Sequence, residues 1–152
     1  MSRDTPSTFA WFAIHILIPL FPFLLEGFIR LFIIDGIKLN TFSAVTLSIS
    51  SGFLAVFVSH TLKDYEDIPS DRAEEDSVKG ASVMFLLTSI VFFALFGLLV
   101  TLRALVVDKN ITEIKGIYKL FQVVVFALSV VPVTVSVAVQ RSFKLKASAS
   151  LW

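Results

Sequence analysis

The stretch FAWFAIHILIPLFPFLLEGFIRLFII, residues Phe9 to Ile34, decides the fold class because it is long and apolar enough to cross a bilayer. Five polar or helix-breaking residues interrupt it at intervals of four, three, four and four residues. At about 100° per residue, they fall within an arc of roughly 80° on one face of a helix. Charged groups inside a membrane are costly and usually mark function. We therefore predict that any specific activity involves this polar stripe, which consists of His15, Pro19, Pro22, Glu26 and Arg30.

The composition of the chain supports the membrane class. Of the 152 residues, 56% are hydrophobic and 16% are charged, whereas soluble domains have about 45–50% apolar and about 25% charged residues. The formal net charge is +1 and no basic-aromatic patch is evident, so we expect no direct nucleic-acid partner. The sequence contains no cysteine, which excludes disulfides, thiolate metal sites and thiol catalysis. The lipid bilayer is therefore the first expected partner.

Four segments are long enough to cross about 30 Å of hydrocarbon at about 1.5 Å per residue. We predict an all-α integral membrane protein that forms a single four-helix transmembrane domain over residues 1–152. Pro19 and Pro22 each remove a backbone donor and clash with the preceding turn, so they predict a kink in the first helix. The expected segments are spans at 9–34, 42–62, 80–103 and 117–139, an acidic loop at 63–79 and a basic tail at 140–152.

The distribution of basic residues predicts the orientation in the membrane. Four spans put both termini on one side, and that side carries seven basic residues against five on the other, or six if Arg30 is counted. By the positive-inside rule, we expect cytoplasmic termini and a location in the inner (plasma) membrane. The seven residues are Arg3, Lys63, Arg72, Lys79, Arg141, Lys144 and Lys146, and the five are Lys38, Arg103, Lys109, Lys115 and Lys119.

The longest predicted loop, KDYEDIPSDRAEEDSVK, runs from Lys63 to Lys79 and has seven acidic residues against three basic ones. One interpretation is a solvated connector, in which Asp76 or Ser77 caps the start of the third span. The other is a docking surface for a soluble cytoplasmic protein, to which the basic tail also contributes. The predicted docking residues are Asp64, Glu66, Asp67, Asp71, Glu74, Glu75, Asp76, Arg141, Lys144 and Lys146.

The charged and imidazole groups of the polar stripe have more than one interpretation. Glu26 precedes Arg30 by four residues, the favourable order for a helical ion pair that neutralises itself near the interface. Alternatively, Glu26 lines a cavity or an oligomer axis, where several copies would form a ring of charge such as pores use to select ions. His15 and His60 fall toward the same membrane side on neighbouring spans. This leaves haem ligation as a minor alternative to simple hydrogen-bonded histidines, and we predict no cofactor.

The second span carries small residues at steps of four. Such ridges let helix backbones approach closely, and hydroxyl groups can form hydrogen bonds across the contact. The third span has a similar row of residues, and Gln122 and Ser129 share one face of the fourth. We predict helix packing at Ser48, Ser51, Gly52, Ala55, Ser59 and Gly97.

The residue types used in catalysis are not arranged for it. No glycine-rich phosphate loop occurs, no acid is placed to orient either histidine, and metal-ligand spacing is lacking. We therefore expect neither an enzyme nor a metal site. Two functions remain open. The first is an oligomeric membrane subunit that senses a membrane event and anchors or signals to a soluble cytoplasmic partner. The second is an ion channel or membrane-permeabilising effector with the polar stripe along its pore.

The layout of the chain resembles one group of bacterial proteins. From FAWFAIHILIPLFPFLLEGFIRLF at 9–32 to VVPVTVSVAVQRSFKLK at 130–146, four spans follow one another without a soluble domain. In this respect the chain is similar to the membrane subunits of the Kiwa antiphage defence system. The resemblance implies a homo-oligomeric membrane subunit that works with a soluble, DNA-binding cytoplasmic partner in antiviral defence. It is a resemblance of layout and assigns no role to an individual residue.

Overall fold

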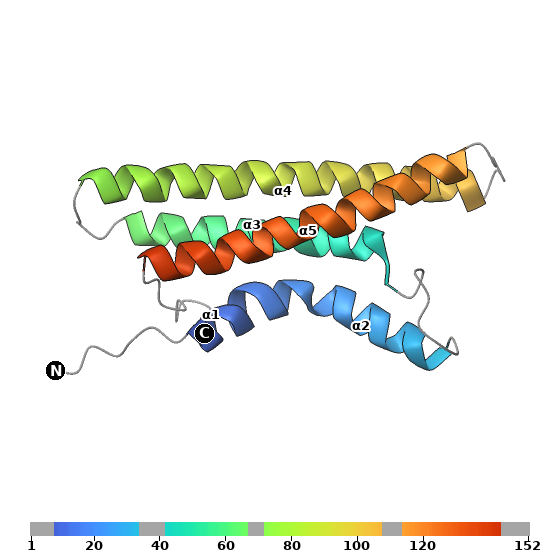
Figure 1. The fold of residues 1–152 in the computed structure, drawn as a ribbon, viewed down its shortest axis with the longest axis horizontal. Coiled ribbons are helices and arrows are strands. Elements are labelled where there is room, and N and C mark those ends of the chain that lie inside the picture. Colours follow the sequence, from blue (N-terminus) through green and yellow to red (C-terminus); the bar gives the residue numbers. More distant parts are fainter. Residues whose placement is uncertain (1–7, 34–41, 67–71, 108–113, 144–152) are drawn as a thin grey trace.

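The computed structural model describes residues 8–33, 42–66, 72–107 and 114–143, and these ranges are almost entirely helical (Figure 1). They contain no strand. The first helical segment is continuous but changes type, because a π-helical turn separates two α-helical parts. The elements are α1 (Thr8–Phe12), η1 (Ala13–Leu17), α2 (Ile18–Ile33), α3 (Ala44–Glu66), α4 (Arg72–Val107) and α5 (Lys115–Phe143).

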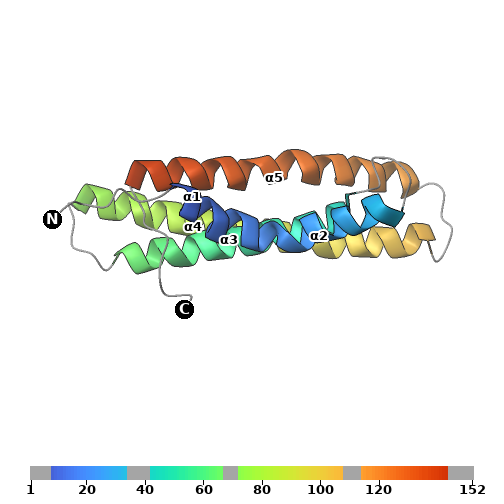
Figure 2. The same cartoon turned by 90° about the horizontal axis from the view of Figure 1, so that it is seen from below.

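Within the described residues, four helices are long and apolar enough to span a membrane, which confirms an all-helical fold there and indicates a multi-pass membrane protein. The first candidate span combines α1, η1 and α2. Successive spans run antiparallel, so α1 and α4 start at the same end of the bundle where α3 and α5 finish (Figures 1 and 2). The candidate spans are Phe9–Ile33, Ala44–Asp64, Asp76–Val107 and Lys115–Phe143.

Helix α3 is the central helix of the bundle. It packs against α2, α4 and α5, and its most apolar part is 56% buried, compared with 17% for the first span. In Figure 1, α4 and α2 lie on opposite sides of α3, while α5 crosses α3 obliquely. The small side chains of α3 explain this position, because serine, glycine and alanine let neighbouring backbones come close.

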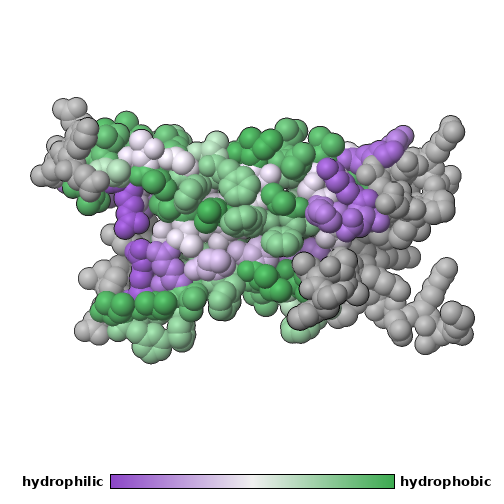
Figure 3. All heavy atoms as spheres, turned by 180° about the vertical axis from the view of Figure 1, so that it is seen from behind, coloured by the Kyte–Doolittle hydropathy of each residue, from purple (hydrophilic) through white to green (hydrophobic). Residues whose placement is uncertain are grey.

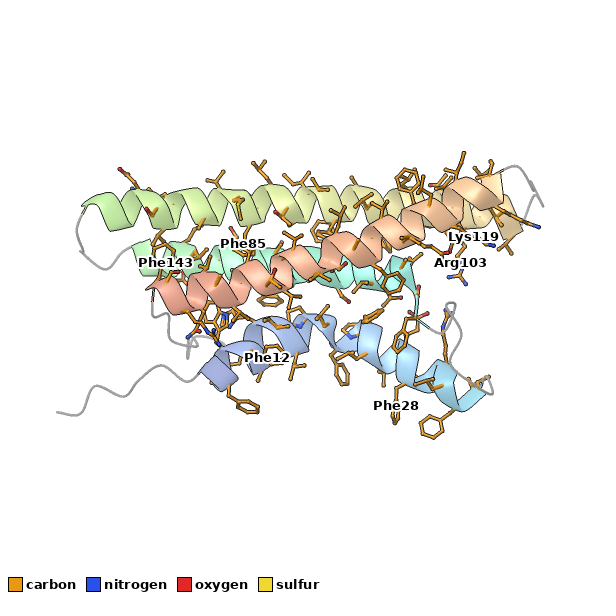
Figure 4. All side chains as sticks on the ribbon, viewed as in Figure 1. Phe12, Phe28, Phe85, Arg103, Lys119 and Phe143 are labelled. Carbon is orange, nitrogen blue, oxygen red and sulfur yellow. The ribbon has the colours of Figure 1, made fainter. Side chains whose placement is uncertain are left out.

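Two clusters of buried apolar side chains fill the space between the helices. One cluster includes Trp11, Leu54 and Phe85 and lies toward the end where α1 begins. Figure 4 shows Phe85 on the inner side of α4. The other cluster lies toward the opposite end and includes Leu99 and Val125. Each cluster takes residues from α3 or its neighbours, so the core follows the length of α3.

The outer surface of the helices is largely apolar. Phe9, Phe32 and Ile33 of the first span are 78%, 77% and 75% exposed, and exposed apolar side chains also cover α4 and α5. Figure 3 shows this apolar surface over much of the rear face. Soluble monomers rarely expose a continuous apolar area of this extent. The hydrocarbon of a bilayer is the environment that suits it.

The predicted acidic loop is shorter than expected. α3 continues to Glu66 and α4 begins at Arg72, so most of the segment 63–79 is helical. Asp76 and Ser77 lie inside α4, and the prediction that one of them caps this helix is therefore wrong. The physical reason is that alanine, glutamate and arginine are strong helix formers, so the helix does not stop where the apolar residues stop.

The first span contains an irregularity just before its prolines. Ala13–Leu17 form a π-helical turn, in which the Ile18 N–H donates to the Ala13 carbonyl oxygen. Such turns are rare and frequently occur at functional sites. α2 then continues through Pro22. The kink expected at Pro19 and Pro22 stays a prediction, and the π turn is the irregularity that the structure records.

Candidate functional site

Glu26 joins α2 to α3 through both of its carboxylate oxygens. Its Oε1 accepts a hydrogen bond from Arg30 Nη2, one turn later on the same helix. Its Oε2 accepts a hydrogen bond from Thr46 Oγ1 on α3. The side chains of Glu26 and Arg30 are 26% and 30% exposed. The geometry favours an ion pair that neutralises itself and is held on α3 of the same chain.

A polar cavity of about 210 Å³ lies beside this ion pair, where α2 and α4 end and α3 and α5 begin. Figure 4 labels Arg103 at this end of the bundle, and Figure 3 shows hydrophilic surface around a hollow at its left-hand end. Two guanidinium groups and three neutral polar side chains face the cavity. The lining residues are Arg30, Phe42, Ser43, Arg103, Val107, Tyr118 and Gln122.

At the opposite end of the bundle, His15 is enclosed by neighbouring helices. His15 is 1% exposed, and its ring stacks on Trp11 with the ring centroids 3.8 Å apart. His15 Nε2 lies 2.9 Å from Thr61 Oγ1 on α3, and Nδ1 lies 3.3 Å from the Trp11 carbonyl oxygen. Trp11 Nε1 donates to Ser136 Oγ on α5 over 3.3 Å. This cluster joins the first span to α3 and α5.

His60 does not belong to that cluster. Its side chain is 74% exposed, and its Nδ1 lies 3.3 Å from Asp64 Oδ2 one turn later on α3. The haem alternative is therefore wrong for this arrangement, because His60 points away from the bundle while His15 is enclosed in it. In the parts of the chain that the structure describes, no three His, Asp or Glu side chains gather in a way that would hold a metal ion.

Hydroxyl groups of α3 lie at its interfaces with α4 and α5. Ser48 Oγ donates to a backbone carbonyl of α4 over 2.8 Å, and Ser51 Oγ donates to Ser129 Oγ over 3.1 Å. The hydroxyls of Ser59 and Ser82 each donate to the other residue's carbonyl oxygen, over 2.9 and 3.1 Å. Within membranes, one such hydrogen bond contributes roughly 0.6 kcal/mol on average. Their main effect is therefore to fix which helix faces meet.

The small residues predicted for packing do not all lie between helices. Gly52 and Ala55 are buried, and a Cβ on Gly52 would lie 2.8 Å from the Phe93 ring of α4. Gly97 is exposed, and a Cβ there would meet nothing within 4 Å. Gly97 therefore does not pack against another helix of the described chain, because this residue of α4 faces away from the bundle.

The structure divides the polar stripe of the first span. His15 and Pro19 are buried, Glu26 and Arg30 are half-buried, and Pro22 is exposed. The helical period of 3.6 residues and the π turn both rotate successive stripe residues about the helix axis, so these residues do not form a straight row. The stripe therefore contributes to two separate groups at opposite ends of the bundle, and not to one continuous site.

The predicted docking residues are described in part. Asp64, Asp76 and Arg141 are exposed, and they lie at the end of the bundle where α3 and α5 finish and α4 starts. This end is the one that the acidic segment was expected to occupy. Of the remaining residues, Glu66, Glu74 and Glu75 belong to α3 and α4, while Asp67, Asp71, Lys144 and Lys146 lie outside the described residues.

The sequence alone does not predict that Arg30 and Arg103 line the same cavity, because the two residues lie on different spans and no motif links them. A weak signal exists in their positions, since both lie about one turn before the end of a helix, on ends that share one membrane side. The sequence also does not single out Thr46 as a partner of Glu26, because its hydroxyl resembles the packing hydroxyls of the same span.

Comparisons with protein-family models, with curated proteins and with solved structures produced no match. Similarity therefore assigns no family to the chain. The structure defines its class by the fold: a bundle with four helices able to span a membrane, a polar cavity at one end and a buried histidine cluster at the other.

Proposed function

We propose that the protein is a non-enzymatic, oligomeric subunit of the inner membrane that senses a membrane event and anchors or signals to a soluble cytoplasmic partner. The resemblance in layout to Kiwa membrane subunits adds a role in antiviral defence to this proposal. The observation that carries it is a charged helical extension of α3 and α4 beyond their apolar parts.

Helix α4 is longer than a membrane requires. Its 36 residues extend about 54 Å at about 1.5 Å per residue, whereas the hydrocarbon core is about 30 Å thick. Because Arg72–Lys79 is rich in charged residues, we assign these first two turns of α4 to the excess length. They lie next to the charged end of α3, Lys63–Glu66. We call these two helix ends the acidic projection. A helical extension fixes the course of the backbone that carries these charges, which a flexible connector would not do.

The acidic projection suits a partner with a basic surface. Its two helix ends carry five acidic residues against three basic ones, and Asp64 and Asp76 are exposed. Complementary charges accelerate encounter and suppress wrong partners, although exposed ion pairs add little affinity by themselves. A soluble protein that presents lysine and arginine is therefore the expected partner.

The oligomeric part of the proposal rests on the first span. Only 17% of its most apolar part is buried in the subunit. Phe12 and Phe28 point away from the other helices (Figure 4). A second copy that packs on this face would bury these rings. Native mass spectrometry of the purified protein measures the number of copies directly.

The absence of cysteine makes the orientation testable with single introduced thiols. In intact cells, a membrane-impermeant maleimide should label Lys115→Cys and leave Asp76→Cys unlabelled, because the proposal puts the acidic projection in the cytoplasm. Both variants should be labelled after lysis, which controls for accessibility. Labelling of Asp76→Cys in intact cells would show that the orientation is reversed.

Docking is tested with a photo-crosslinking residue in place of Ser77, in the acidic projection. Irradiated native membranes should yield one soluble protein in near-stoichiometric amount. Charge reversal by Asp64→Lys and Asp76→Lys should lower this yield at least about tenfold at low salt, because like charges then face each other. Lys115→Glu, a reversal at the opposite end, should leave the yield unchanged. Equal yields from all variants would rule out docking at the acidic projection.

The alternative function is an ion channel or membrane-permeabilising effector with the polar stripe along its pore. A charged ring would require Glu26 to face a shared axis between copies. Glu26 instead accepts hydrogen bonds from Arg30 and Thr46 of its own chain. This observation supports the partner-linked function over conduction.

A further inference from the structure

We propose that the polar cavity between α2, α4 and α5 binds a phosphate group. The cavity has a volume of about 210 Å³, several times the space that one water molecule needs. Two of its described lining residues are arginines and none of them is acidic. A guanidinium group presents a planar fork of N–H donors that matches two oxygens of a phosphate. The cavity thus has the charge and the types of donor that a phosphate needs.

Arg103 carries most of this argument. No hydrogen bond or ion pair joins Arg103 to another residue that the structure describes, and its side chain is exposed at the cavity. Arg30, on the facing wall, shares its charge with Glu26. An unneutralised guanidinium close to the membrane gains stability from any anion that reaches it. Among the described lining residues, positive charge therefore exceeds negative charge.

Neutral donors complete the lining. Ser43 is 8% exposed, and its Oγ accepts a hydrogen bond from the Thr46 N–H over 3.4 Å, which leaves its own hydroxyl proton to donate. Tyr118 adds a phenolic hydroxyl, and Gln122 adds two amide N–H donors. The charged oxygens of a phosphate are acceptors, and they can take hydrogen bonds from all of these groups. These side chains add donors for a phosphate, and the positive charges of Arg30 and Arg103 disfavour a cation at this position.

The position of the cavity along the helices lets a phosphate reach it from two sources. Arg103 lies four residues before the end of α4 at Val107, and Tyr118 lies three residues after the start of α5 at Lys115. Both side chains are thus within about 6 Å, measured along a helix axis, of a helix end. Lipid phosphates and interfacial tyrosines occupy this depth in membranes. A lipid headgroup from the bilayer and a free phosphate from water would offer the same oxygens.

The full chain in detergent tests both sources. Native mass spectrometry compares phosphatidylglycerol with diacylglycerol, which lacks phosphate, and a titration with inorganic phosphate monitors thermal stability. Arg103→Ala should weaken binding roughly tenfold, because it removes charge-assisted hydrogen bonds. Lys115→Ala is the matched control, since it removes one positive charge at the same end without touching the cavity. Its effect should stay within about twofold, as expected for an exposed charge.

Each outcome has a defined meaning. Arg103-dependent binding of phosphatidylglycerol alone assigns the site to a lipid headgroup, and Arg103-dependent binding of inorganic phosphate assigns it to a free anion. The proposal is overturned if neither ligand binds, or if Arg103→Ala weakens binding no more than Lys115→Ala does. Circular dichroism and elution volume should match the wild type for both variants, because both residues are exposed.

Discussion

Replacing Trp11 with alanine is expected to lower the free energy of unfolding by about 3–5 kcal/mol, as for other large aromatic residues in cores. Trp11 is 0% exposed, its ring stacks on His15, and its Nε1 donates to Ser136. Alanine would leave an empty space where the first span meets α3 and α5, and it would remove the hydrogen bond between the first and last helices. A reversible unfolding titration with SDS in detergent micelles measures the loss.

Two variants separate packing from the other effects of this change. Trp11→Phe keeps an aromatic ring and loses the N–H donor, so it should cost only about 0.6–1.7 kcal/mol for the hydrogen bond. Phe9→Ala removes an aromatic ring two residues earlier that is 78% exposed, and it should change stability by less than about 0.5 kcal/mol. If Trp11→Ala costs no more than Phe9→Ala, the enclosed position of Trp11 does not stabilise the fold.

Replacing Gly52 with leucine is expected to cost about 3 kcal/mol, at the upper end of overpacking effects. A Cβ at Gly52 would lie 2.8 Å from a Phe93 ring carbon, closer than real Cβ contacts. The Phe93 ring also packs edge-on against Phe53, with ring centroids 5.6 Å apart, so a shift of Phe93 would disturb that contact as well. Leucine would therefore push α3 and α4 apart. The same SDS titration measures the change.

Gly97 provides the matched control on α4. Gly97→Leu introduces the same side chain where nothing lies within 4 Å, so stability should stay the same or rise by up to about 1 kcal/mol from better helix propensity. Phe93→Ala combined with Gly52→Leu should recover part of the loss, because the ring that causes the clash is gone. Equal losses at Gly52 and Gly97 would contradict close packing of α3 on α4.

The number and type of the helices follow from the sequence, because runs such as Phe9 to Ile34 have few stable structures other than a spanning helix. Small residues at steps of four also indicate α3 as a helix whose neighbours approach closely. The residues at which the helices begin and end are harder to predict from the sequence. The start of α4 at Arg72 lies beyond the apolar residues, since polar residues with high helix propensity extend a helix without any change in hydropathy.

Contacts between spans are harder to predict than the spans themselves. Gly52 and Gly97 look alike in sequence, yet one meets a phenyl ring and the other meets nothing within 4 Å. The rotation of each helix about its own axis decides this difference, and that rotation is set by the whole bundle. This rotation also decides that Arg30 and Arg103 line the same cavity.

The central position of α3 has a consequence for how the protein is made. α3 is the least apolar of the four candidate spans and the most enclosed. Ser48, Ser51 and Ser59 of α3 form hydrogen bonds with α4 and α5, which leave the ribosome later. These hydrogen bonds form only after α4 and α5 follow, and the mutual Ser59–Ser82 bonds then join α3 and α4 as a hairpin. A chain interrupted before α4 would leave these three serine hydroxyls without their partners, and α3 would keep only its contacts with the first span.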